Sequence, residues 1–194
     1  MLKLKTNSLV EERLEEFKQL NQLDTKYWFS ELCFCILTAN SKAITAIKIQ
    51  QEIGPQGFIS LSQEELSRII RDNKHRFHNN KAKFIVQARE FIDIKSRIEK
   101  LTGPEAREFL AKNIKGLGYK ESSHFLRNVG YDDVAIIDRH ILRFLHEQKL
   151  ISSIPKSITK TNYLIFEQIL SKFGIAHSRL DLIIWQKMTG NVLK

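Results

Sequence analysis

The chain has 194 residues, of which 42% are hydrophobic and only 3 are prolines, so it can bury a core and is not a disordered chain. Its 31 Lys and Arg against 22 Asp and Glu give a formal net charge of +9, which favours a polyanionic partner such as nucleic acid without naming one. Residues 1–5 lack the apolar core of a signal peptide, and no later segment has the ~18 uncharged apolar residues that a membrane span needs. We therefore expect a soluble, intracellular protein of the cytoplasm or nucleoid that makes no membrane contact.

Apolar residues recur at helical spacing in almost every part of the chain, and no stretch alternates with the period of a β-strand. The helical stretches cover residues 9–20, 28–36, 44–53, 66–70, 84–92, 155–172 and 179–187. Helix stops are expected at residues 54–55 and 102–104, and a helix start at Ser62. No low-complexity linker or repeat divides the chain. The pattern predicts an all-α protein with two helical lobes in a single fold over residues 1–194.

Cys33 and Cys35 lie two positions apart in an apolar stretch that is predicted to be a helix. Residues at this spacing point in different directions on a helix, so a disulfide between them is not expected. We expect buried, reduced thiols that pack as small apolar groups, with reactive thiol chemistry as the alternative.

A Gly-x-Gly turn lies between two helical patterns in the segment from Asn113 to Gly130. We interpret residues 105–130 as a helix-hairpin-helix, in which Gly116 and Gly118 allow a tight turn. Backbone N–H groups in such a turn, beside the N-terminus of the next helix, can bind a DNA phosphate. The alternative is an ordinary turn between two helices with a glycine cap.

A lysine and an aspartate near this hairpin are the candidate catalytic pair. Lys120 opens the helix after the turn, where the positive end of the helix dipole disfavours an ammonium and favours a nucleophilic amine. Asp138 follows the apolar run 135–137. For Lys120 the alternative is a lysine that binds phosphate or faces solvent, which is also what we expect of Lys115. For Asp138 the alternative is the N-cap of the helix through residue 145. Capping and catalysis are compatible.

The segment resembles the helix-hairpin-helix family of DNA glycosylases, with Gly-Leu-Gly-Tyr-Lys120 matching the hairpin and its lysine and Ile-Ile-Asp138 matching the family aspartate. Four further stretches, at residues 31–40, 76–83, 123–130 and 181–185, are similar to the archaeal-type 8-oxoguanine DNA glycosylases. The similarity runs from Trp28 to Lys194. Endonuclease III-like members carry four cysteines after the catalytic region for an iron–sulfur cluster, and no cysteine lies there in this chain.

The resemblance implies a bifunctional DNA glycosylase/AP lyase. Such an enzyme excises 8-oxoguanine from double-stranded DNA through a lysine Schiff base and cleaves the strand by β-elimination. Asp138 would stabilise the positive charge that develops on the sugar and orient or deprotonate Lys120. We expect a monomer without cofactor or metal. The alternatives are a non-catalytic helix-hairpin-helix DNA-binding module and a glycosylase for another damaged base.

Three polar residues are expected to contact DNA near the flipped nucleotide. By resemblance, Asn40 lies where family members insert a polar side chain into the vacated stack, although a helix-end cap is an equal alternative. Arg139 and His140 can contact phosphate, although a histidine on a helix surface is more often solvated.

Three further residues are candidates for reading the base. The resemblance puts Trp185 and Phe77 around the base, where their aromatic faces can stack on a purine, with core packing as the alternative. It also brings the C-terminus to the pocket, where the Lys194 α-carboxylate or a neighbouring carbonyl would accept a hydrogen bond from N7–H. Guanine, which has an acceptor at N7, would then be rejected. The alternative is a frayed tail.

Overall fold

The computed structural model describes residues 8–192 and 194, and this part of the chain contains helices but no strand. The all-α prediction is therefore confirmed. None of the described helices is both long and apolar enough to cross a membrane. The helices, in chain order, are α1 (Ser8–Gln22), α2 (Thr25–Thr38), α3 (Ala43–Ser60), α4 (Gln63–Asp72), α5 (His78–Ala88), the 3₁₀ helix η1 (Arg89–Phe91), α6 (Ile94–Ile98), α7 (Gly103–Asn113), α8 (Tyr119–Asn128), α9 (Arg139–Glu147), α10 (Lys160–Ser171) and α11 (His177–Thr189).

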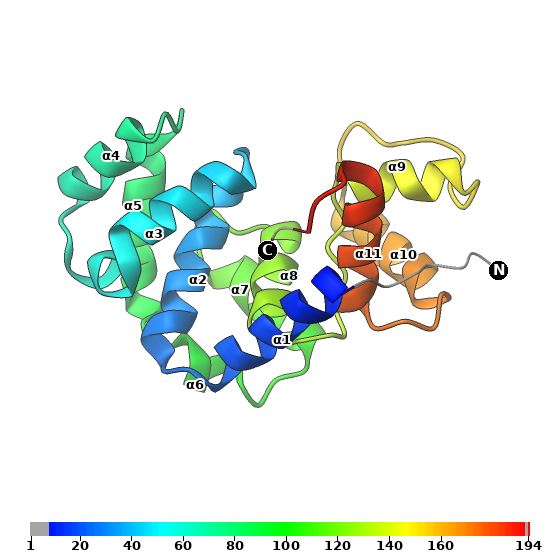
Figure 1. The fold of residues 1–194 in the computed structure, drawn as a ribbon, viewed down its shortest axis with the longest axis horizontal. Helices are drawn as coiled ribbons and strands as arrows, with labels where there is room; N and C mark the ends of the chain where they lie inside the picture. The colour runs from blue at the N-terminus through cyan, green and yellow to red at the C-terminus, as the bar shows by residue number, and fades with distance from the viewer. Residues whose placement is uncertain (1–7, 193) are drawn as a thin grey trace.

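The helices form two lobes, as the sequence predicts (Figure 1). The larger lobe contains α2 to α8 around one apolar cluster, and the smaller lobe contains α9 to α11 around a second. Helix α1 lies across both lobes, and its Val10 and Phe17 pack with Leu182 and Ile183 of α11 in a third cluster. The first helix therefore joins the lobes on one side of the molecule.

Helix α2 is the centre of the larger lobe because ten successive side chains, from Trp28 to Leu37, are buried on all of its faces. It packs against α3, α5, α6 and α8. Cys33 and Cys35 are fully buried and unpaired, and burial raises the pKa of both thiols well above the usual value. The prediction of buried, reduced thiols is confirmed, because a thiol that stays protonated is a poor nucleophile.

Local sequence explains several of the helix boundaries. Ser62 begins α4 with a capping box, as predicted, in which its side chain accepts from the Glu65 backbone N–H and the Glu65 carboxylate accepts from the Ser62 N–H. The expected stop at residues 54–55 is a kink inside α3, where Gly54 adopts φ 66°. The expected stop at 102–104 is wrong: Thr102 starts α7 with a second capping box.

Three histidines that are buried or partly buried make the stability of the fold depend on pH. Burial lowers the pKa of His75, His124 and His177 below the usual 6.5. The unfolded chain therefore binds more protons below about pH 6.5, and the histidines contribute stability that is lost as the pH falls through that window. His75 also has a geometric reason to stay neutral, because its Nδ1 accepts from the Phe77 N–H while Nε2 lies 3.0 Å from the Leu37 carbonyl.

We predict that His75→Gln makes the fold less sensitive to acid, because glutamine offers a donor and an acceptor but does not titrate. Urea unfolding at about pH 7.5 and about pH 5.5 measures the change in the free energy of unfolding. The unmodified protein should lose more stability between these two values than the variant does. Equal losses would show that His75 is protonated in the folded state without a penalty.

Candidate active site

A cavity of about 440 Å³ lies between the lobes and is lined by residues from both. Its walls come from the α2–α3 connection, α8, the segment that leads into α9, and α11. Most of the predicted site residues meet here: Asn40, Lys120, Asp138, Arg139, His140, Trp185 and Lys194. A cavity between two lobes, with titratable groups converging on it, is the usual form of a ligand site.

The hairpin between α7 and α8 needs glycine at one of its two predicted positions. Gly116 has φ +92°, and a Cβ there would lie 2.8 Å from a ring carbon of Phe84. Gly118 has ordinary extended dihedrals and serves as the N-cap of α8. Neither glycine lines the cavity; both precede the helix that carries Lys120 into it. Binding of phosphate at the hairpin remains a prediction.

Lys120 lies in the first turn of α8 and its side chain is 40% exposed at the cavity. Its Nζ is 3.0 Å from Oε1 of Glu121, which is mostly buried. Sequence reasoning missed this partner because adjacent residues on a helix usually point apart. A second lysine, Lys81, has its pKa lowered by burial to about 8, but it lies outside the cavity and donates to the Ile36 carbonyl at 2.6 Å.

Asp138 is the N-cap of α9, which confirms the capping interpretation. Its Oδ1 accepts from the backbone N–H groups of His140 and Ile141, each at 2.8 Å. Oδ2 takes no part in the cap, and the residue also lines the cavity. Within the described residues no hydrogen bond or ion pair joins Asp138 to Lys120. Both residues line the same cavity.

A buried polar chain runs from the larger lobe to the smaller one, and two of its residues, Arg127 and Asp181, line the cavity. Arg127 of α8 pairs with Asp181 of α11, and its Nε and Nη2 donate to Oδ1 of Asn128 at 3.0 and 2.8 Å. Asn128 donates to Oε1 of Glu31 at 2.6 Å. Burial raises the pKa of Asp181 to about 6, and Arg127 opposes the rise. In the sequence, charged residues inside apolar helical stretches are the signal from which this buried polar chain could have been predicted.

The side chain of Lys194 joins this polar chain. Its Nζ donates to Oε2 of Glu31 at 2.8 Å and to Oε1 of Gln50 at 2.6 Å, and it lies 4.3 Å from the centre of the Phe34 ring. These contacts hold the residue beside the cavity, so the description of a frayed tail does not fit it. Sequence reasoning considered its carboxylate and missed the anchoring of its ammonium group.

Trp185 and His140 form one wall of the cavity. Their rings pack edge to face with centroids 4.6 Å apart. Asn40 follows α2 in the left-handed conformation, with φ 60°, and is exposed at the cavity rim. This conformation is typical of a residue that ends a helix, so the cap interpretation holds for its backbone. Arg139 donates to the Lys156 carbonyl at 3.3 Å.

Phe77 is the one predicted base-reading residue that the structure does not bring to the cavity. It precedes α5 on the larger lobe, and its side chain is 40% exposed, so it is not a core residue either. The guanidinium of Arg76 lies 5.1 Å from the centre of its ring. The resemblance covers this segment but does not specify which way an exposed ring points.

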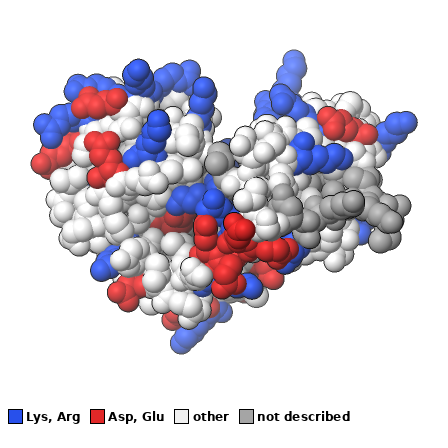
Figure 2. Space-filling model, viewed as in Figure 1, with Lys and Arg blue, Asp and Glu red and all other residues white. Residues whose placement is uncertain are grey.

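A basic groove of about 870 Å³ adjoins the cavity and shares Asn40 and Lys120 with it. Figure 2 shows Lys and Arg on both sides of the notch between the lobes, whereas Asp and Glu gather over α1. An uneven charge distribution of this kind orients a polyanion toward the notch. The cations that line the groove beside Lys120 are Lys42, Lys48, Lys74 and Arg76.

Comparison with solved structures first defines the class. Endonuclease III in a trapped covalent complex with DNA matches with a TM-score of 0.58 at 18% identity, over 96% of this chain and 86% of that one. This match shows that the two chains share a fold. A family model described as 8-oxoguanine DNA glycosylase matches residues 10–178. The chain belongs to the 8-oxoguanine DNA glycosylase family, which confirms the resemblance.

Individual relatives match over nearly the whole chain. The 8-oxoguanine DNA glycosylase/AP lyase of Methanocaldococcus jannaschii is 51% identical over 96% of this chain and 92% of its own length. That of Thermotoga maritima is 44% identical with the same coverage. The crystal structure of the M. jannaschii enzyme with a 15mer DNA containing 8-oxoguanine matches with a TM-score of 0.92, over 96% of this chain and 92% of that one.

We predict that Arg127→Met lowers the free energy of unfolding by about 3–5 kcal/mol, because it leaves the Asp181 carboxylate buried without a counter-ion. Adding Asp181→Asn to this variant should restore part of the loss, since a neutral amide costs less to bury than a charge. Urea unfolding of the single and double variants measures both effects. A loss below about 1 kcal/mol in the single variant would mean that Asp181 is solvated.

Proposed function

We propose that the chain excises 8-oxoguanine from double-stranded DNA with Lys120 as the nucleophile and then cleaves the strand at the abasic site. The observation that carries this proposal is the convergence of Lys120 and Asp138 on one cavity between the lobes. The names of the relatives in this family, 8-oxoguanine DNA glycosylase/AP lyase, support the reaction. The M. jannaschii enzyme in complex with DNA containing 8-oxoguanine supports the substrate.

The cavity provides what a flipped base requires. A glycosidic bond is out of reach inside the base stack, so the nucleotide has to leave the duplex before the reaction. Trp185 offers an aromatic face for stacking, and His140, which packs on it, is better suited to the pocket wall than to a phosphate. Asn40 at the rim would enter the vacated position in the stack.

The chemistry follows from the residues that face the cavity. Lys120 loses a proton, for which Glu121 at 3.0 Å and Asp138 are the nearby carboxylates, and its amine attacks C1′. The C1′–N9 bond breaks as the new C–N bond forms, the base leaves with a proton, and Asp138 stabilises the positive charge on the sugar. Opening of the sugar ring produces a Schiff base. Loss of a C2′ proton then expels the 3′ phosphate by β-elimination.

Binding of the duplex rests on the basic surface around the cavity. The groove with Lys42, Lys48, Lys74 and Arg76 lies next to the cavity and can neutralise phosphates, and Arg139 is near enough to take part. The hairpin glycines Gly116 and Gly118 would bind a phosphate through the backbone. Because the substrate is genomic DNA, we place the protein in the cytoplasm or nucleoid. A monomeric state stays a prediction.

We predict that Lys120→Gln reduces excision by roughly a thousandfold or more and abolishes borohydride trapping on 8-oxoguanine DNA, because the nucleophilic amine is gone. DNA affinity should stay within about threefold, since the hairpin and the basic groove are unchanged. The matched control is Lys115→Gln, which removes an exposed lysine of the hairpin and should still be trapped. Retained trapping by Lys120→Gln would refute the assignment of Lys120 as the nucleophile. If the unmodified protein is not trapped, the chain is a DNA-binding module without catalytic activity.

We also infer that the segment around Lys194 reads the oxidised base, with its carboxylate or a neighbouring carbonyl as the acceptor for N7–H. Glu31 and Gln50 hold the Lys194 ammonium, which supports a fixed position for the carboxylate of the same residue, while the neighbouring carbonyl lies outside the described residues. Removal of residues 191–194 should reduce 8-oxoguanine excision about tenfold or more while cleavage of an abasic site, which has no base to read, stays nearly unchanged. Equal excision by the truncated and full-length proteins would assign discrimination to the cavity walls alone.

A further inference from the structure

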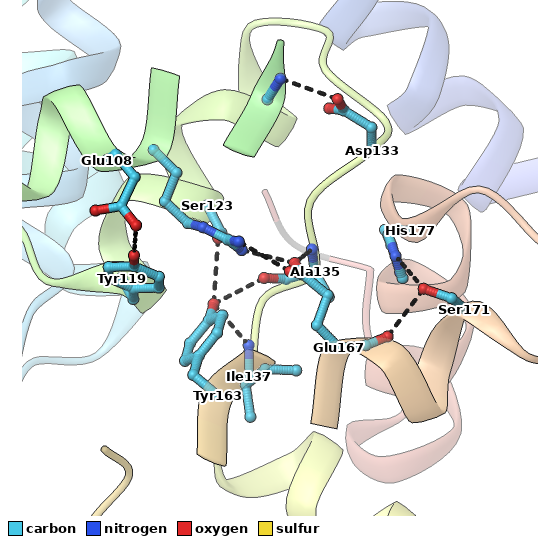
Figure 3. Close-up of polar contacts among 12 residues, drawn as sticks. Glu108, Tyr119, Ser123, Asp133, Ala135, Ile137, Tyr163, Glu167, Ser171 and His177 are labelled. Atoms are coloured by element: carbon cyan, nitrogen blue, oxygen red, sulfur yellow. Dashed lines mark hydrogen bonds and ion pairs between the residues drawn. The ribbon is translucent and has the colours of Figure 1, made fainter. Parts of the chain in front are cut away.

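The segment that joins the lobes, residues 131–138, runs from the end of α8 to Asp138 without helical structure. Its last residues are buried between the lobes rather than exposed as a loop. Two side chains of α10, Tyr163 and Glu167, hydrogen-bond to the backbone of Ala135 and Ile137, and both side chains also contact residues of the larger lobe (Figure 3). The position of Asp138 relative to Lys120 therefore depends on what holds this segment.

Tyr163 of α10 binds the segment at two points. Its hydroxyl donates to the Ala135 carbonyl at 2.7 Å and accepts from the Ile137 backbone N–H at 3.1 Å. The same oxygen lies 3.2 Å from Oγ of Ser123 on α8, the helix that carries Lys120. Tyr163 is buried, and burial raises the pKa of its hydroxyl, so the hydroxyl remains a donor. One side chain thus ties the residue before Asp138 to the helix of the nucleophile.

Glu167, one turn further along α10, binds the segment at a third point. Its Oε1 accepts from the Ala135 N–H at 2.7 Å and from Nη1 of Arg107 at 2.6 Å, while Oε2 accepts from Nη2 of Arg107 at 2.8 Å. Arg107 comes from α7 of the larger lobe and is buried. Its guanidinium lies 4.9 Å from the ring centre of Tyr119, the residue before Lys120.

We propose that Tyr163 and Glu167 are positioning residues for base excision, which hold the backbone at Ala135 and Ile137 and thereby fix Asp138 relative to Lys120. The proposal rests on the proposed function, in which Lys120 and Asp138 are the catalytic residues. Neither Tyr163 nor Glu167 lines the cavity, so they act on the reaction only through the residues that they hold. Displacement of a reacting group by about 1 Å can slow an enzyme about a hundredfold, which makes the fixed backbone a functional requirement.

The test is a double-mutant cycle between Tyr163→Phe and Asp138→Asn, followed by single-turnover excision of 8-oxoguanine over times long enough to measure the slow variants. Tyr163→Phe removes only the hydroxyl and should slow excision about tenfold to a hundredfold, with DNA affinity unchanged. In the Asp138→Asn background the same change should alter the rate by no more than about twofold, because the group that Tyr163 positions is already lost.

The matched control is Ser171→Ala, which removes another hydrogen-bonded hydroxyl from α10. Ser171 bonds the Glu167 carbonyl at 3.0 Å and lies 3.2 Å from Nε2 of His177, away from the segment before Asp138. Its excision rate should match that of the unmodified protein. If Tyr163→Phe does not fold, the double variant Arg107→Met/Glu167→Ala replaces it in the cycle, because it removes the acceptor for the Ala135 N–H without leaving the Arg107 guanidinium buried and unpaired.

Multiplicative losses in the double variant would overturn the proposal, because they would show that Tyr163 acts independently of Asp138. A loss of rate in Ser171→Ala equal to that in Tyr163→Phe would also overturn it, as a general effect of weakening α10. Unchanged excision in Asp138→Asn alone would instead overturn the catalytic role of Asp138. That result would concern the proposed function, and it differs from multiplicative losses in the double variant, which would concern only the role of Tyr163.

Discussion

Two buried arginine–carboxylate pairs cross from the larger lobe to the smaller one, and the cavity between the lobes depends on them. Arg107 of α7 pairs with Glu167 of α10, and Arg127 of α8 pairs with Asp181 of α11. Each pair carries a desolvation cost that only good geometry and further hydrogen bonds can offset. The Arg107 pair has two parallel contacts, and both pairs have additional neutral partners. A rotation of one lobe would leave these charges buried and unpaired.

The apolar contacts between the lobes act in the same direction as the ion pairs. Val10 and Phe17 of α1 pack on α11, and the guanidinium of Arg127 lies 5.0 Å from the centre of the Phe17 ring. The first helix therefore covers one ion pair and shields it from water, which strengthens the electrostatic attraction. These contacts fix the position of one lobe relative to the other. The relative position of the lobes determines the width of the cleft that holds the proposed catalytic groups.

Several side chains serve both the fold and the proposed reaction. Asp138 caps α9 through Oδ1 and also lines the cavity, so one residue fixes a helix start and supplies a charge there. Glu31 is buried in the central helix of the larger lobe, yet it receives hydrogen bonds from Asn128 and Lys194. Side chains with both roles have little freedom to move, because the fold holds them in place. Stabilisation of a developing charge requires groups that are fixed in this way.

The sequence by itself determined the helical class, the hairpin turn and the cap at Asp138, because these depend on contacts between near neighbours in the chain, whereas a catalytic role for Lys120 and Asp138 stays a prediction. Helical periodicity, the left-handed turn at Gly116 and the cap at Asp138 are local properties that a pattern can express. Only the tertiary structure decided that Glu121 pairs with Lys120, that Lys194 is anchored by Glu31, and that Phe77 lies outside the cavity. It also decided that Arg107 meets Glu167, since residues sixty positions apart come together only when the two lobes pack, and no period in the sequence encodes that contact.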